Sequence, residues 1–136
     1  MSAVMEKGYV LVVDDEPLLC RMVSAMLMRA GYDTLTATNG RDALAQAKLR
    51  PPEVITLDVM MPDMSGIEVA RCLRSAPDTA GIPIIFVTAL DRSVSMDLRH
   101  FTEEPDVYQV DKPFSRAQLL AQVSTALQAK ENRMIA

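Results

Sequence analysis

The chain has 136 residues, of which 49% are hydrophobic and 24% are charged, and this composition is typical of one globular domain. A net charge of -4 without a Lys/Arg cluster argues against nucleic-acid binding. No apolar run approaches the roughly 20 residues of a membrane span, and MSAVMEKG lacks the pattern of a signal peptide, so we expect a cytoplasmic protein with no membrane partner.

Five short apolar runs alternate with five helical patterns along the chain. The runs predict strands at Tyr9–Val13, Asp33–Ala37, Val54–Leu57, Ile84–Val87 and Val107–Val110. The first, third and fourth are apolar on both faces, as expected of strands that helices cover on both sides. The second alternates apolar and polar residues, which favours an edge strand.

The helical patterns have recognisable starts and stops. The first begins near Pro17, carries apolar residues at helical spacing from Leu18 to Ala30, and ends at Gly31. The second, third and fifth begin at typical capping residues, which are Asn39-Gly40, Ser65 with Glu68, and Ser115 with Gln118. The fourth pattern, around Leu98, is the weakest. Strict alternation of strands and helices predicts an α/β fold with a parallel sheet and right-handed crossovers.

Cysteine and histidine usage narrows the chemistry. Cys20 and Cys72 fall inside helical patterns, and we expect both to be reduced and buried. The chain has no CxxC motif and a single histidine, His100. The sequence therefore argues against imidazole-rich metal sites and Ser-His-Asp catalysis.

Polar side chains follow four of the five predicted strands. In chain order they are Asp14-Asp15, then Asp58, then Thr88 followed by Ala89, and finally Asp111 with Lys112-Pro113. In open parallel sheets, ligands bind beyond the carboxyl ends of the strands. We therefore expect three carboxylates, a hydroxyl and an ammonium group to meet at one edge of the sheet.

Such a cluster needs a cation. Two carboxylates about 4 Å apart repel by roughly 4 kcal/mol at an effective dielectric constant near 20. Lys112 offsets part of this charge, and Mg²⁺ would offset more, since it prefers one or two carboxylates with waters and phosphate oxygens. Mg²⁺ with lysine is also a common clamp on a transferring phosphoryl group, and a carboxylate can itself accept that group.

Four motifs, VLVVDDE, LDVMMPDMSG, IPIIFVTA and DKPF, occur in this order between Tyr9 and Ala129. In this combination the chain resembles a response-regulator receiver domain of bacterial two-component signalling, similar to the chemotaxis response regulators. The resemblance implies a single doubly wound (βα)5 flavodoxin-like domain whose five-stranded parallel sheet has the order 2-1-3-4-5. We expect the receiver domain at residues 9–130, a flexible N-terminus at 1–8 and a C-terminal tail at 131–136.

The resemblance also implies the roles of the acidic residues. Asp58 accepts a phosphoryl group from a histidine kinase or a histidine phosphotransfer protein. Asp14 and Asp15 hold Mg²⁺, and Asp58 and the backbone carbonyl of Met60 complete the protein ligands. The protein is then a signalling switch that catalyses only its own phosphorylation and slow dephosphorylation, rather than an enzyme acting on other molecules.

The remaining site residues act around the phosphoryl group on the same resemblance. Lys112 pairs with its oxygens, Thr88 turns its hydroxyl towards it, and the small Ala89 leaves it room. The Lys112-Pro113 peptide bond is cis, a form that X–Pro bonds adopt at low cost. Pro62 and Gly66 shape the loop after Asp58. The surface of the fourth helix, fifth strand and fifth helix then carries the output.

Two positions depart from the family pattern. Receivers usually carry an aromatic switch residue three positions before the lysine, where this chain has Gln109, and Tyr108 lies one position earlier. Either a local bulge lets Tyr108 take this role, or the aromatic part of the switch is missing. Met60 and Leu90 occupy positions that flank the path of the hydrolytic water, and neither can orient a water, so we expect slow dephosphorylation.

The implied partners are the phosphodonor protein and a downstream protein or output domain outside this chain, and the protein would be a monomer or a weak phosphorylation-dependent dimer. Two alternatives remain open: a docking scaffold that needs no phosphorylation, and a small aspartyl-phosphate phosphatase of the haloacid-dehalogenase type. The phosphatase family requires Asp-x-Asp after the first strand, whereas Asp14-Asp15 is followed here by Glu16. Nucleotide binding is disfavoured because neither GxGxxG nor GxxxxGK is present.

Overall fold

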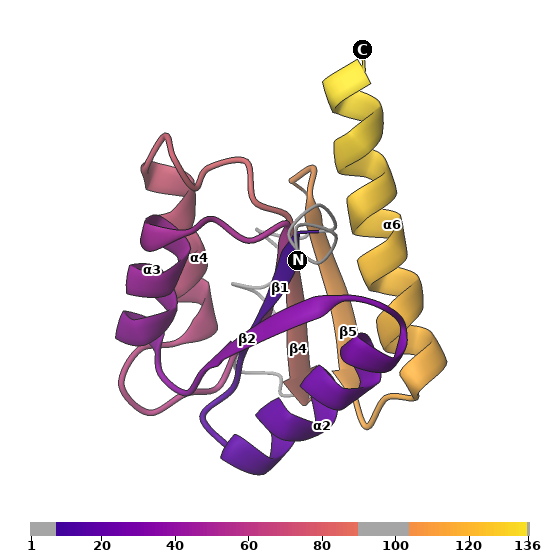
Figure 1. Cartoon of the computed structure of the whole chain (residues 1–136). Coiled ribbons are helices and arrows are strands. Elements are labelled where there is room, and N and C mark those ends of the chain that lie inside the picture. The colour runs from indigo at the N-terminus through magenta and orange to yellow at the C-terminus, as the bar shows by residue number, and fades with distance from the viewer. Residues whose placement is uncertain (1–7, 90–103, 136) are drawn as a thin grey trace.

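A parallel five-stranded sheet forms the centre of the molecule (Figure 1). The computed structural model describes residues 8–89 and 104–135. The strand order is β2-β1-β3-β4-β5, which confirms the predicted doubly wound fold. The strands are β1 (Tyr9–Val13), β2 (Asp33–Ala37), β3 (Val54–Asp58), β4 (Ile84–Ala89) and β5 (Val107–Lys112). The last three extend one or two residues beyond the predicted ends, so Asp58, Thr88 and Lys112 belong to the strands themselves.

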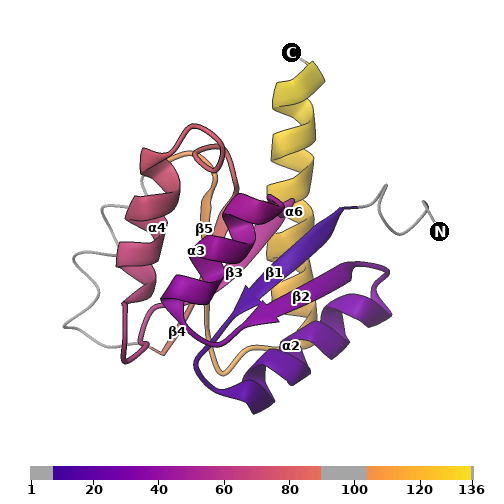
Figure 2. The same cartoon turned by 60° about the vertical axis from the view of Figure 1, so that its left-hand side comes forward.

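The described part of the chain forms four helices, which cover both faces of the sheet (Figures 1 and 2). They are α2 (Pro17–Arg29), α3 (Gly40–Leu49), α4 (Gly66–Ser75) and α6 (Arg116–Ile135). Helices α3 and α4 lie on one face, and α2 and α6 lie on the other. The helical pattern predicted around Leu98 lies outside the described residues, and so do residues 1–7 of the flexible N-terminus that was predicted at 1–8. None of the described helices is long and apolar enough to cross a membrane.

Helix α6 is longer than predicted, because residues 131–135 continue the helix instead of forming a tail. No glycine or proline interrupts this stretch. Two ion pairs tie the end of the helix to the domain: Lys130 Nζ lies 2.9 Å from Glu53 Oε2, and Arg133 Nη1 lies 2.5 Å from Asp106 Oδ1. The last turns of α6 extend beyond the sheet in both views (Figures 1 and 2).

The helix boundaries are formed by the residues that the sequence indicated. The side chains of Asn39, Ser65 and Ser115 each accept a hydrogen bond from a backbone N–H three residues later. Gln118 returns a bond to the Ser115 N–H, which completes a capping box. Gly31, with φ of 97°, terminates α2, and the Tyr32 N–H donates to the Leu27 carbonyl as in a Schellman motif.

The core consists of one apolar layer on each side of the sheet. Successive residues of β1 alternate between these layers, with Leu11 facing α3 and α4, and Val10 and Val12 facing α2 and α6. The apolar stripe predicted for α2 was partly wrong, because the side chains of Leu18 and Met22 are 75% and 42% exposed. The buried stripe of this helix is narrower than its sequence pattern.

Candidate functional site

The carboxyl ends of β1, β3 and β5 bring acidic and basic side chains together at the lower end of the sheet in Figure 1. Asp14 directly follows β1, Asp58 is the last residue of β3, and Lys112 is the last residue of β5. One carboxylate oxygen from each of Asp14, Asp15 and Asp58 lies within 4.8 Å of the others. The strand ends therefore assemble the acidic cluster that the sequence predicted.

Lys112 faces two of these carboxylates. Its Nζ atom lies 3.4 Å from Asp14 Oδ2 and 3.6 Å from Asp58 Oδ1. Asp14 and Asp58 are buried, whereas Asp15 and Lys112 are partly exposed. The cluster thus holds three carboxylates and one ammonium group, and it keeps a net negative charge that attracts a cation.

Backbone contacts hold the two buried carboxylates in place. Asp14 Oδ1 accepts a hydrogen bond of 2.9 Å from the Glu16 N–H, and the Asp14 N–H donates to the Ala37 carbonyl at 3.2 Å. Asp58 Oδ1 accepts a bond of 3.3 Å from the Met60 N–H. Each of the two buried carboxylates thus accepts a hydrogen bond from a backbone N–H two residues later.

Burial and a neighbouring negative charge shift the pKa of Asp58. Burial, together with the neighbouring Asp14 carboxylate, raises the pKa of Asp58 from its ordinary value of 3.8 to about 6, although Lys112 opposes the rise. A carboxylate that resists ionisation this strongly stores unfavourable electrostatic energy at neutral pH. A cation or a neutral side chain would relieve it.

We therefore expect Asp58→Asn to stabilise the metal-free protein at neutral pH, by roughly 1–3 kcal/mol. The folded chain binds the Asp58 proton more tightly than the unfolded chain, so stability from this group is greatest below pH 3.8 and falls as the pH rises through 6. The advantage of the asparagine variant should accordingly shrink at acid pH. Urea unfolding in EDTA at neutral pH and near pH 4 measures this, and a difference that does not change with pH would contradict it.

Comparison with known proteins identifies the family. The model of the response regulator receiver domain matches residues 10–124. The chain belongs to this family. This is a family of signalling domains of two-component systems and not the haloacid-dehalogenase phosphatase family, so the phosphatase alternative is set aside.

Two curated relatives are transcriptional regulators by name. The probable transcriptional regulatory protein TcrX of Mycobacterium tuberculosis is 42% identical over 118 residues, which cover 87% of this chain and 49% of TcrX. The alkaline phosphatase synthesis transcriptional regulatory protein PhoP of Bacillus subtilis is 37% identical over 122 residues, which cover 90% of this chain and 49% of PhoP. The chain thus spans about half the length of these relatives.

Solved structures of separate receiver domains match the fold. The chemotaxis protein CheY4 of Vibrio cholerae is 31% identical with a TM-score of 0.78, and the match covers 88% of this chain and 98% of CheY4. The receiver domain of a signal transduction histidine kinase from Syntrophus aciditrophicus is 32% identical with a TM-score of 0.79, covering 90% of this chain and 91% of that domain.

The loop after Asp58 folds back on the strand in this receiver domain. The Gly66 N–H donates to the Val59 carbonyl at 2.9 Å, which closes the loop. A Cβ atom on Gly66 would lie 2.2 Å from the Asp58 carbonyl oxygen, a distance that non-bonded atoms do not reach. Glycine is therefore required here by close packing of the backbone against Asp58.

The residues predicted to surround the phosphoryl group lie at the same strand ends. Thr88 is buried, and its hydroxyl donates to the Ala89 carbonyl at 2.9 Å. In the register of β4 and β5, Thr88 pairs with Asp111 and Ala89 pairs with Lys112. The Lys112–Pro113 peptide bond is cis.

Tyr108 and Gln109 lie on opposite faces of β5. The register between β4 and β5 runs without interruption from Val107 to Lys112, so no bulge turns Tyr108 towards the face of Gln109. Tyr108 packs against the core layer beneath α6. The Gln109 side chain donates a hydrogen bond to Asp111 Oδ1 at 2.7 Å, so the Asp111 carboxylate has a partner other than Lys112. The local bulge that would let Tyr108 act as the aromatic switch residue is therefore absent from β5.

Two contacts at the site were not predicted. The Met60 N–H bond to Asp58 follows from the turn after β3, while the Met60 side chain is 52% exposed. The buried Cys20 thiol contacts the Asp14 carbonyl at 3.3 Å, and burial raises the pKa of this thiol, which keeps it protonated. One feature of the sequence could have indicated this contact: Cys20 follows Asp14 by six residues and lies on the buried face of α2. Leu90, the second residue expected to slow dephosphorylation, lies outside the described residues.

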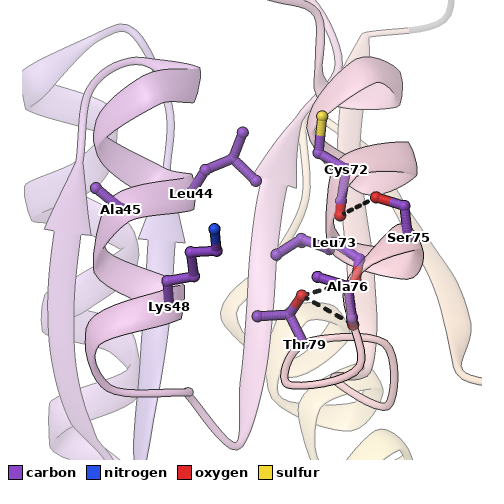
Figure 3. A pocket seen from close by; sticks show the side chains of 8 residues that line it. All are labelled: Leu44, Ala45, Lys48, Cys72, Leu73, Ser75, Ala76 and Thr79. Atoms are coloured by element: carbon purple, nitrogen blue, oxygen red, sulfur yellow. Dashed lines mark hydrogen bonds between the residues drawn. The ribbon is translucent and has the colours of Figure 1, made fainter.

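A separate hollow of about 280 Å³ lies between α3 and α4, away from the acidic cluster (Figure 3). Cys72, which was expected to be buried, is exposed at this hollow. Hydroxyl groups here are paired within the chain: Ser75 donates to the Cys72 carbonyl at 2.8 Å and Thr79 donates to the Leu73 carbonyl at 2.7 Å. The hollow is a seam between two helices, and its residues take no part in the site.

Proposed function

We propose that this receiver domain accepts a phosphoryl group on Asp58 from a histidine kinase or a histidine phosphotransfer protein, in a reaction that depends on Mg²⁺. The single observation that supports this most is the position of Asp58. It ends a buried strand, lies among two further carboxylates, and faces the ammonium group of Lys112. Family membership makes phosphoryl acceptance the expected chemistry for such a site.

The donor set fits Mg²⁺. Three carboxylates whose oxygens lie within 4.8 Å of one another provide hard oxygen ligands, and the acidic pair Asp14 and Asp15 begins directly after β1. Asp14, Asp15, Asp58 and the Met60 carbonyl would hold the ion. When bound, Mg²⁺ neutralises charge on the carboxylates and on the phosphoryl oxygens.

The chain's own residues carry the transfer. An oxygen of Asp58 forms a bond to phosphorus while the bond from phosphorus to the donor imidazole nitrogen breaks, and the imidazole leaves with that electron pair. Lys112 pairs with the phosphoryl oxygens, and the Thr88 hydroxyl leaves the Ala89 carbonyl to donate to them. Ala89 provides space. Met60 and Leu90 cannot orient a water by hydrogen bonding, so dephosphorylation is slow.

The signal arises from the new charge. Aspartyl phosphate adds strong acceptors and negative charge where Lys112 and Thr88 can bind them. The movement of Lys112 and Thr88 would favour one arrangement of β4 and β5. A downstream protein or an output domain outside this chain would recognise that arrangement on the surface that includes β5 and α6. We propose a monomer, or a weak dimer that forms on phosphorylation.

Removal of the metal tests the proposal. Wild-type protein incubated with acetyl phosphate and Mg²⁺ should gain the mass of one phosphoryl group, as measured by intact-protein mass spectrometry. In EDTA the initial rate should fall by about 100-fold or more, because the carboxylate repulsion is then uncompensated. Equal rates with and without metal would overturn the Mg²⁺ requirement, and no gain in either buffer would favour the docking scaffold.

A further inference from the structure

A buried thiol lies directly beneath the acidic cluster. Cys20 is on α2, and its residue is 3% exposed. Its Sγ atom lies 3.3 Å from the Asp14 carbonyl oxygen, 3.7 Å from that of Ala37 and 4.0 Å from that of Val12. A thiol has one proton to donate, so its hydrogen bond goes mainly to the nearest acceptor, Asp14.

The orientation of the Asp14 carbonyl also affects the position of Asp15. This carbonyl and the Asp15 N–H belong to one planar peptide group. The orientation of that plane sets the direction in which the Asp15 side chain leaves the backbone. A donor that holds the carbonyl therefore positions Asp15 relative to Asp14, although it touches neither carboxylate.

The other polar groups of Asp14 already have partners. The N–H donates to Ala37, Oδ1 accepts from Glu16, and Oδ2 faces Lys112. Within the described part of the chain, the Cys20 thiol is the donor that contacts the Asp14 carbonyl. Loss of the thiol would leave this buried acceptor without that partner and free the peptide plane to rotate.

We infer that Cys20 is a positioning residue for the divalent cation, because its thiol holds the Asp14–Asp15 peptide in the orientation that directs both carboxylates towards Asp58. This inference rests on the proposed Mg²⁺-dependent function. It assigns to Cys20 no direct contact with the ion, with the phosphoryl group or with an oxidant.

The test compares Cys20→Ala, Cys20→Ser and Val23→Ala with the wild type. Val23 is a matched control, because it is buried on the same helix and also leaves a small cavity when truncated, while its apolar side chain has no donor for the Asp14 carbonyl. Mg²⁺ affinity is measured by NMR titration of the backbone amides. Thermal unfolding in EDTA records stability separately, and the carbonyl ¹³C shift of Asp14 reports its hydrogen bond.

Cys20→Ala should weaken Mg²⁺ binding about three- to tenfold and shift the Asp14 carbonyl signal, in keeping with the loss of one hydrogen bond. Cys20→Ser keeps a donor and should bind within about twofold of wild type. Val23→Ala should lower the unfolding temperature and leave the affinity unchanged. At saturating Mg²⁺, the acetyl phosphate reaction of Cys20→Ala should return to the wild-type rate, since the chemical groups are intact.

Three results would overturn the inference. These are an unchanged Mg²⁺ affinity in Cys20→Ala, an equal loss in Val23→Ala, and a serine variant that binds as weakly as the alanine variant. Any of them leaves the proposed function standing if the wild type binds Mg²⁺ and is phosphorylated. A wild type that shows no saturable Mg²⁺ binding would instead overturn the proposed function, and the inference with it.

Discussion

An Asp58→Asn variant should gain no phosphoryl group from acetyl phosphate and Mg²⁺ under conditions in which the wild type gains one. The amide replaces the nucleophilic oxygen by a poor nucleophile and keeps the size of the side chain. Asp14 and Asp15 remain in this variant. We expect neither to substitute, because both follow β1 and so lie at a different strand end from Asp58, the last residue of β3. The loss of uptake should therefore be complete, as read from intact-protein mass.

Asp63→Asn is the matched control for this variant. Asp63 lies in the loop after β3 and is exposed, and the change in charge and size is the same. This variant should be phosphorylated at the wild-type rate. Uptake by Asp58→Asn at a rate close to that of Asp63→Asn would show that another residue is the acceptor. The stability measurement in EDTA confirms in parallel that Asp58→Asn is folded.

The parts of the fold that could be predicted depend on local chemistry. Capping side chains at Asn39, Ser65 and Ser115 specify helix starts through contacts three residues away, so the sequence alone indicates them. The acidic cluster was also predictable, because parallel strands end at one edge whatever their exact lengths. Once β1, β3 and β5 were recognised, the meeting of Asp14, Asp58 and Lys112 followed.

The features that were missed depend on contacts between distant segments. Leu18 fits the helical period of α2 but is exposed, because the sheet covers a narrower stripe than the helix offers. The end of α6 is held by Glu53 and Asp106, which are far away in sequence. The face of β5 on which Tyr108 lies depends on whether this strand contains a bulge. Only the register between β4 and β5 shows that it does not. The Cys20 contact required the position of α2 against the end of β1.

Gly66→Ala should be the most destabilising of the small substitutions at the site. The added methyl group would lie 2.2 Å from the Asp58 carbonyl oxygen and 2.9 Å from the Val59 Cα. Both are backbone atoms, so no side-chain rotation relieves the overlap, and the loop must move away from the end of β3. We expect a loss of about 3 kcal/mol or more in the free energy of unfolding, measured with urea.

Gly81→Ala separates this packing effect from the general effect of replacing a glycine. A Cβ atom on Gly81 would meet no heavy atom within 4 Å, so the variant should stay within about 1 kcal/mol of wild type. Because the loop carries Asp58 at its start, Gly66→Ala should also phosphorylate more slowly wherever it remains folded, whereas Gly81→Ala should react normally. Equal stability of the two variants would mean that the loop can relax, and that Gly66 does not hold Asp58 in position.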